Sequence, residues 1–477
     1  MAADKPWALV LAATAAAPIL LAAAPEAKDP PVKPAGPSTA TYSDSGVKPA
    51  PQEWADQIKQ PTDWLKWGAD LRLRQEFHEN AITLDNEVPG NIWNYQRYRA
   101  RVWGSLLPSD NIAINNRWVW EGRYWWEPGL REGFEESYII ADQLNVQAKD
   151  LGGSKSTITV GRQDIILNEG WLILEGTPLD GSRTIFFDAA RAQYQVNQKQ
   201  SVDVAVLATH SDADDFSPII MSDDEAKLVE QDEYGAYLDY RWNPSKATQY
   251  DAYFIYKHDK DPIFAPRLGD QGDVYTFGGR ADHTFTENIR ARVEAAYQFG
   301  DRENGFTPST GEMSAFGVTS RATYAFKDQM DNKLHLSFEF LSGDNPSTNQ
   351  NEAFDPLWGR WPQFSELYVY TVASETRIAE VTNLYRIGPT WEVLPNQRMN
   401  ISMSYYALFA DQRTYAASPG FGDGYFRGQL VQAFLRYKFN RYLAGHLWGE
   451  YFIPGDYYSE NRDDNAVFLR AELSLTF

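Results

Sequence analysis

The chain has 477 residues, no cysteine, a net charge of −21 and a mean hydropathy of −0.50. The absence of cysteine excludes disulfide bonds, thiol catalysis and cysteine zinc sites, and the acidic balance argues against a nucleic-acid partner, because such proteins expose a basic surface. Beyond the N-terminus no apolar run is long enough to cross a membrane as a helix, so membrane residence requires a β-barrel.

Residues 1–24 are predicted to be a signal peptide. Residues 7–24 form an apolar, alanine-rich run with small residues near its end, which is typical of an export signal. Cleavage near Ala23 and cleavage near Ala27 both fit the sequence. The alternative is a single spanning helix, because about 18 apolar residues can just cross a bilayer. Residues 25–66 are predicted to be a proline-rich linker followed by a short periplasmic segment with some helix, where a periplasmic partner could bind.

Residues 67–477 are predicted to form an all-β fold, an 18-stranded antiparallel transmembrane β-barrel. Segments of about ten residues alternate between apolar and polar side chains, as the strands of such barrels do. The even number of strands returns both ends of the barrel to one side. The predicted strands begin near Trp67, Asn94, Ile112, Glu136, Lys155, Arg183, Ser201, Glu233, Gln249, Asp273, Asn288, Glu312, Asn332, Ala379, Gln397, Arg427, Tyr442 and Ala466.

The connections between these strands alternate in length. The short ones carry Pro, Asn or Asp and are predicted to be periplasmic turns: 107–111, 197–200, 243–247, 285–287, 327–331, 393–396 and 440–441. The long ones are predicted to be extracellular or to fold into the lumen: 78–93, 164–182, 211–232, 343–378 and 411–426. A ten-residue strand rises roughly 33 Å, and a tilt near 40° reduces this to about 25 Å, the height of the apolar belt.

The last twelve residues show the strand pattern most clearly. Leu469, Leu473 and Leu475 fall on one face, whereas Arg470 and Glu472 fall on the other. Such a segment has lipid on one side and water on the other, and the terminal aromatic Phe477 is typical of outer-membrane barrels. The sequence therefore predicts the outer membrane of a Gram-negative bacterium, with outer-membrane lipid and the barrel-assembly machinery as partners.

The same alternation assigns the arginines of the strands to the lumen. In residues 289–299, Val293 and Tyr297 share one face, and Arg290 and Arg292 share the other. The opposite assignment would place every arginine against lipid at about 2 to 4 kcal/mol each. The predicted lumen arginines are Arg72, Arg74, Arg97, Arg99, Arg101, Arg117, Arg123, Arg162, Arg191, Arg241, Arg280, Arg290, Arg292, Arg321, Arg386, Arg436 and Arg470.

A lumen rich in guanidinium groups predicts an anionic solute, because these groups stay charged and bind carboxylates with two hydrogen bonds. The alternative is that the arginines pair with lumen acids in a neutral network. The candidate acids are Asp70, Glu76, Glu121, Asp203, Asp239, Glu294, Glu339 and Glu472. Arg97, Arg99 and Arg101 follow one another on a strand that contains no acid, and we expect their side chains to face water.

Residues 160–194, which include the triplet Gly161-Arg162-Gln163, resemble the core of bacterial alginate export outer-membrane porins and their wider relatives. Residues 64–74 and 451–477 are similar to the same family, so that the resemblance spans the barrel. It implies an 18-stranded barrel with an arginine-rich lumen that passes an anionic polyuronate. It also implies that Arg162 lies at the constriction, lined by Arg191 and by Arg97, Arg99 and Arg101.

Signals for other chemistry are weak. The six histidines are scattered, the acidic loops lack the spacing of a calcium-binding loop, and no nucleophile motif is present. We therefore predict no enzyme activity, no catalytic residues, no metal site and no cofactor.

The sequence as a whole predicts a monomeric channel for an anionic polysaccharide or its fragments. One alternative is a general porin for small anions or sugars. Another is a plugged structural or adhesin barrel, since residues 343–378 are long enough to fold inward and carry the aromatic-rich stretch 354–361.

Overall fold

The computed structural model describes residues 54–128, 133–136, 139–174, 187–210, 232–260, 271–303, 311–360, 364–376, 378–416 and 418–477. The predicted signal peptide and residues 25–53 lie outside these ranges. The helical elements in them are α2 (Trp54–Lys59), α3 (Tyr368–Thr371) and the 3-10 turns η2 (Leu151–Gly153) and η3 (Val372–Ser374). Among the described helices, none combines the length and the apolar character needed to span a membrane.

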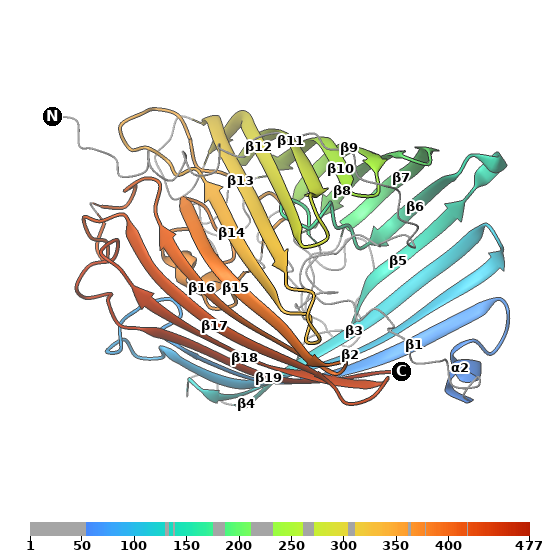
Figure 1. Ribbon diagram of the computed structural model, residues 1–477, viewed down its shortest axis with the longest axis horizontal. Helices are drawn as coiled ribbons and strands as arrows, with labels where there is room; N and C mark the ends of the chain where they lie inside the picture. Colours follow the sequence, from blue (N-terminus) through green and yellow to red (C-terminus); the bar gives the residue numbers. More distant parts are fainter. Residues whose placement is uncertain are drawn as a thin grey trace. The chain divides into compact units, whose positions relative to one another are not determined.

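The strands form one antiparallel sheet that closes on itself (Figure 1). Their bounds are β1 Leu65–Glu79, β2 Ile92–Ser109, β3 Ile112–Glu127, β4 Gly133–Glu136, β5 Ile140–Lys149, β6 Ser156–Gln163, β7 Phe187–Asn197, β8 Gln200–Thr209, β9 Glu233–Ser245, β10 Thr248–Asp259, β11 Gln271–Thr284, β12 Ile289–Glu303, β13 Glu312–Ala325, β14 Lys333–Leu341, β15 Leu384–Asn396, β16 Met399–Phe409, β17 Phe426–Lys438, β18 Leu443–Pro454 and β19 Ala466–Thr476.

The predicted 18-stranded barrel is confirmed. Of the 19 strands in the described residues, β4 and β5 both pair with β3, β4 beside its second half and β5 beside its first, so these two share one place in the wall. The barrel closes where β1 pairs with β19, from Asp70 opposite Thr476 to Glu79 opposite Val467. Phe477 extends this seam, because its N–H donates to the Ala69 carbonyl at 2.8 Å. Closure pairs the first and last strands of the described sheet, which would otherwise be open edges in the membrane.

Side-chain alternation defines the two faces of the wall as predicted. On β19, Leu469 and Leu473 are 52% and 45% exposed on the outer face, whereas Phe468 and Arg470 are buried. The apolar outer face is suited to lipid, and the charged inner face is not.

Most strands begin within a few residues of their predicted starts, but two starts differ. The strand predicted near Ala379 begins at Leu384, because Ala379 and Asn383 have φ angles of 69° and 52°, which an extended strand does not accommodate. The strand predicted near Arg183 is β7, which is described from Phe187 onward, and residues 175–186 lie outside the described ranges.

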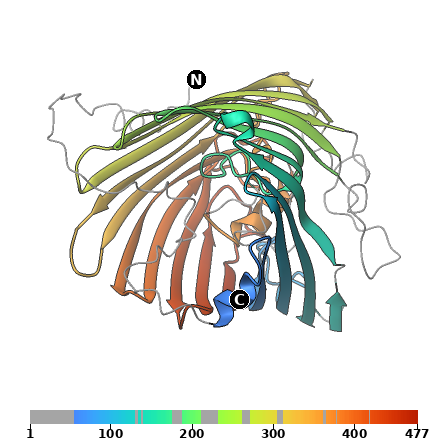
Figure 2. The same cartoon turned by 90° about the vertical axis from the view of Figure 1, so that its right-hand side faces the viewer.

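Two of the long connections fold inward. We call the described residues of 164–174 the first inner segment and those of 343–383 the second inner segment. Trp358 N–H donates to the Leu172 carbonyl at 3.0 Å, and Leu174 N–H donates to the Trp358 carbonyl at 3.2 Å, so the two segments are joined. Figure 2 shows α3, part of the second segment and drawn in orange, inside the ring of strands.

The apolar core of the molecule lies between these segments and the barrel wall. Leu172, Ile173, Phe354 and Trp358 are almost fully buried among side chains from the strands. Gly235 on β9 permits this packing, because a Cβ there would overlap the ring of Trp358. Burial of these groups gives the inner segments a fixed position rather than leaving them in solvent.

Candidate functional site

Arginine side chains line the face of the strands that the inner segments contact. On β1, Arg72 and Arg74 are each 3% exposed, whereas Leu71 and Leu73 are each 41% exposed. The period of two in an extended strand produces this alternation. The same face carries the acids of neighbouring strands, so the inner surface is a field of opposite charges rather than a purely basic one.

The arginine series on β2 is paired across strands. Arg97 Nε donates to Glu121 Oε1 of β3 at 2.7 Å. Arg101 Nε donates to Asp70 Oδ2 of β1 at 2.7 Å, and Arg99 Nη2 lies 3.4 Å from the other oxygen of Asp70. The expectation that these three side chains face water is wrong: they are only 13%, 7% and 13% exposed. The acids come from adjacent strands, which a reading of β2 alone could not reveal.

Most other predicted lumen arginines have carboxylate partners within 4.0 Å. The pairs are Arg72 and Arg74 with Glu472, Arg117 with Asp142 and Asp164, Arg123 with Glu121, Arg191 with Asp203, Arg241 with Asp251, Arg280 with Glu169 and Asp282, Arg290 with Asp282, Arg292 with Glu169, Arg386 with Glu339, and Arg470 with Glu76 and Glu366. Several of these acids belong to the inner segments, so the arginines also hold those segments against the wall.

Arg162 is fully buried. Its Nε and Nη2 donate to the two oxygens of Asp188 at 2.8 and 2.9 Å, and its Nη1 donates to the Ala141 carbonyl at 3.2 Å. Gly161 beside it has φ of 115°, and the inward and outward alternation breaks there, so that Arg162 and Gln163 are both buried. Arg162 thereby ties β5, β6 and β7 together. It offers no exposed surface to a solute, and its placement at the constriction stays a prediction.

Arg321 on β13 differs from the arginines above. Its Nε donates to Ser337 Oγ at 3.3 Å, and no described carboxylate lies within 4.0 Å of it. Arg386 lies near enough to repel it, and the guanidinium of Arg386 stacks 4.8 Å from the ring of Tyr406. Farther along the wall, Arg436 packs 3.9 Å from the ring of Phe434.

The wall around Arg321 carries hydroxyl groups beside the ion pair of Arg386 with Glu339. We call the inner face of β13, β14, β15 and β16 the hydroxyl wall. Thr390 Oγ1 lies 2.9 Å from Ser404 Oγ and 3.0 Å from the hydroxyl of Tyr406. These groups can donate and accept hydrogen bonds with a polar solute.

Sequence reasoning missed the charges that anchor the second inner segment to β9, β10 and β12. Lys257 Nζ lies 2.9 Å from Asp259 and 3.7 Å from Asp355, and Arg302 Nε lies 3.4 Å from Asp355. Burial alone would raise the pKa of Asp355, but Arg302 and Lys257 hold that pKa below its ordinary value. Arg360 pairs with Glu233 at the same place.

The other end of the second inner segment is anchored to the opposite part of the ring. Glu450 on β18 accepts a hydrogen bond from Ser365 Oγ at 2.5 Å and from the N–H groups of Glu366 and Leu367 at 3.0 Å. Arg427 on β17, which is fully buried, donates to both carboxylate oxygens of Glu375 at 2.5 and 2.7 Å. The second inner segment therefore touches both sides of the barrel and narrows its interior.

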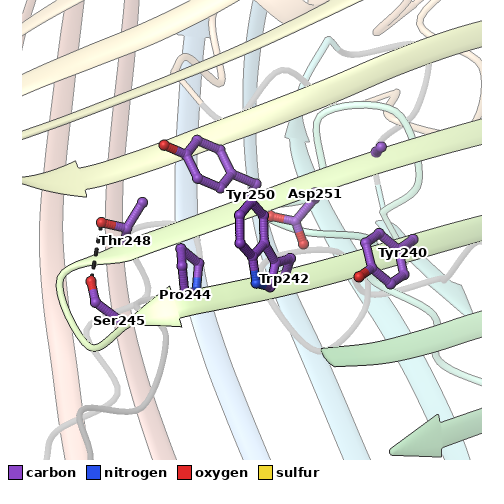
Figure 3. Close-up of a pocket in the computed structure, with 8 residues that line it drawn as sticks. Tyr240, Trp242, Pro244, Ser245, Thr248, Tyr250 and Asp251 are labelled. Carbon is purple, nitrogen blue, oxygen red and sulfur yellow. Dashed lines mark hydrogen bonds between the residues drawn. The ribbon is translucent and has the colours of Figure 1, made fainter. Parts of the chain in front are cut away.

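A hollow lies elsewhere, on the hairpin of β9 and β10 (Figure 3). Tyr240, Trp242, Pro244 and Tyr250 line it, and the rings of Trp242 and Tyr250 are 5.6 Å apart. These aromatic side chains are about 40% exposed on the outer face, at the end that carries the short turns. Such positions suit the boundary between lipid and water, so this hollow belongs to the outer surface rather than to the lumen.

The described residues contain no group of three His, Asp or Glu side chains placed to hold a metal ion.

The family model for alginate export matches residues 63–471. The chain belongs to the alginate export family. This match runs from the start of β1 into β19, and it agrees with the resemblance seen at the Gly161-Arg162-Gln163 triplet. No curated protein matches the chain.

Solved channels share the fold of this member of the alginate export family. OccAB2 from Acinetobacter baumannii has 12% identity and a TM-score of 0.56, with 86% of this chain and 98% of that chain covered. OccAB4 from the same organism has 10% identity and a TM-score of 0.55, with 88% and 100% covered. OpdK from Pseudomonas aeruginosa, solved with vanillate, has 11% identity and a TM-score of 0.52, with 86% and 99% covered. Membership of the alginate export family together with the closed barrel identifies the protein as an outer-membrane β-barrel channel.

Proposed function

We propose that this channel conducts an anionic polysaccharide or its fragments, and that Arg321 on the hydroxyl wall is the guanidinium that meets the solute. The observation that carries this proposal is that no described carboxylate lies within 4.0 Å of Arg321, while most arginines around the ring are in such contact with an acid. A guanidinium that is not in direct contact with a carboxylate can bind the carboxylate of a solute, and the wall hydroxyls beside it can bind the hydroxyl groups of that solute. The arginines that already bind acids would have to break an ion pair to do the same.

A second candidate is a porin for small anions. The second inner segment touches both sides of the ring, which favours small solutes over a polymer. The vanillate in the OpdK structure is a small carboxylate, which is consistent with this candidate.

Single-channel recording in lipid bilayers distinguishes these candidates. We expect a uronate oligomer to block the current and a neutral sugar oligomer of equal length to block it much less. The variant Arg321→Gln should weaken the block about tenfold, the effect of losing one charge-assisted hydrogen bond. Arg441→Gln, which removes the same charge from an exposed turn, is the matched control and should leave the block unchanged.

Three results would contradict the proposal. Equal block by the charged and neutral oligomers would favour a general porin. Block by a monomeric carboxylate as strong as block by the oligomer would favour the small-anion channel. A folded barrel without measurable conductance would favour the plugged barrel.

A further inference from the structure

A histidine and a glutamate lie on the hydroxyl wall close to Arg321. His335 on β14 is hydrogen-bonded on both ring nitrogens: Nδ1 lies 2.8 Å from Thr323 Oγ1 and Nε2 lies 3.2 Å from Glu392 Oε2. The His335 side chain is 11% exposed and the Glu392 side chain 27% exposed. The pair is therefore fixed in position and still in contact with solvent.

The charges around this pair are few. Asn400 Nδ2 donates to the other oxygen of Glu392 at 2.9 Å and adds no charge. Lys333 is opposite Glu392 in the strand register, but its Nζ is bound to Asp331 at 2.7 Å. Arg321 lies two residues before Thr323 on the same face, near enough to Glu392 for their charges to attract. Glu392 is thus the acid that opposes the charge of Arg321.

The hydrogen-bonded row of Thr323, His335 and Glu392 has the order of nucleophile, base and acid found in catalytic triads. This order alone does not make the row catalytic. In the strand register Thr323 lies opposite Arg290 of β12 on one side and His335 of β14 on the other. The backbone N–H groups around Thr323 are therefore used in hydrogen bonds of the sheet. Hydrolysis also needs donors aimed at a developing oxyanion. The property of the His335 and Glu392 pair that matters here is its net charge.

We propose that His335 and Glu392 set the ion preference of the channel according to pH. When His335 is neutral the pair carries one negative charge, which offsets Arg321 and weakens the attraction of anions. When His335 binds a proton the pair becomes neutral, and the charge of Arg321 acts in full. Histidine is the side chain suited to this change between pH 5 and 8. The inference rests on the proposed anion path along the hydroxyl wall.

Reversal potentials under a salt gradient test the pair. For the wild-type channel, the ratio of anion to cation permeability should rise about twofold between about pH 8 and about pH 5.5, since one charge on the path is altered. In His335→Gln this rise should disappear and the ratio should stay at its pH 8 value. In Glu392→Gln the ratio at pH 8 should already be raised, and acidification should raise it further.

The chain offers two histidines as controls. His283 Nδ1 lies 2.8 Å from Thr248 Oγ1, the same contact that His335 makes with Thr323, but it lies on the outer face. His283→Gln should keep the full pH response. His446 lies on the inner face 3.6 Å from Glu472, a carboxylate that Arg74 already binds. The variant His446→Gln should therefore also keep the full pH response.

Retention of the full pH response in a folded His335→Gln channel would overturn the inference, and loss of the response in His446→Gln would then assign it to His446. An unchanged ratio in a folded Glu392→Gln channel, confirmed by its heat-modifiable gel band, would overturn it as well. Failure of the proposed function looks different: the wild-type channel would prefer cations at both pH values, whether or not the preference moved with pH.

Discussion

Two parts of the inner wall carry arginine in different settings. Around β1, β2 and β3, each arginine of the β2 series faces an acid from a neighbouring strand, as Arg97 faces Glu121 and Arg101 faces Asp70. On the hydroxyl wall, Arg321 donates to a serine, is repelled by Arg386 and is attracted by Glu392 without direct contact. The number of arginines in a lumen is therefore a poor measure of its field, because a paired guanidinium contributes little charge to a passing ion. An arginine that lies beside an acid is neutralised, and an arginine without such a neighbour remains available to attract a solute.

The largest effect is expected when the closing contact between β1 and β19, on the ion-paired part of the wall, is removed. Deletion of residues 473–477 removes the pairing of Leu473 with Leu73 and the closing hydrogen bonds of Phe477. We expect the barrel not to insert, since the seam edges would be left unpaired in lipid. A truncated protein that still showed the compact, fast-migrating gel band before heating would refute this. The wild-type protein, run unheated and boiled, provides the reference bands.

Replacement of Arg97, Arg99 and Arg101 by Glu tests whether the ion-paired arginines differ in role from Arg321 on the hydroxyl wall. Asp70 and Glu121 would then face carboxylates, and each broken buried pair costs about 3 to 5 kcal/mol. We expect poor folding, and in any folded fraction a selectivity moved toward cations. The milder Arg99→Gln should lower the midpoint of thermal unfolding in detergent, whereas Arg321→Gln should not. Equal midpoints for these two single variants would contradict the distinction between the walls.

The anchor of the second inner segment should be sensitive to loss of one charge. Lys257→Met leaves Asp259 and Asp355 buried with Arg302 as the cation they still share, so we expect a loss of about 3 to 5 kcal/mol in stability. Lys260→Met is the matched control, because Lys260 pairs with Asp232 at 3.1 Å but is 59% exposed, and such pairs contribute about 0 to 1 kcal/mol. Chemical denaturation in detergent measures both variants. A loss as small in Lys257→Met as in Lys260→Met would show that the anchor is dispensable.

The smallest effect is expected from tags that test orientation. A protease site inserted at Asn461, in the connection between β18 and β19, should be cut on intact cells, because the long connections are predicted to be extracellular. The same site at Lys246, in the turn between β9 and β10, should be protected. Conductance should not change in either. Cleavage at Lys246 with protection at Asn461 would reverse the orientation.

The sequence by itself determined the barrel. Alternation at a period of two is local, so Leu469, Arg470 and Leu473 could be placed on their faces without knowledge of any other strand. Turn residues likewise marked the short connections, and the places of the strands followed from them. The strand predicted at Ala379 begins later, at Leu384, because the apolar pattern does not encode the positive φ angles of Ala379 and Asn383.

Only the tertiary structure decided which arginines are neutralised and where the long connections lie. The partner of Arg99 is set by the register between β1 and β2, and the partner of Arg427 lies in an inner segment far along the chain. Both depend on contacts between residues distant in sequence, for which local alternation carries no information. The sequence therefore gives the charge on each face of the wall, whereas packing across strands decides how much of that charge remains for a solute.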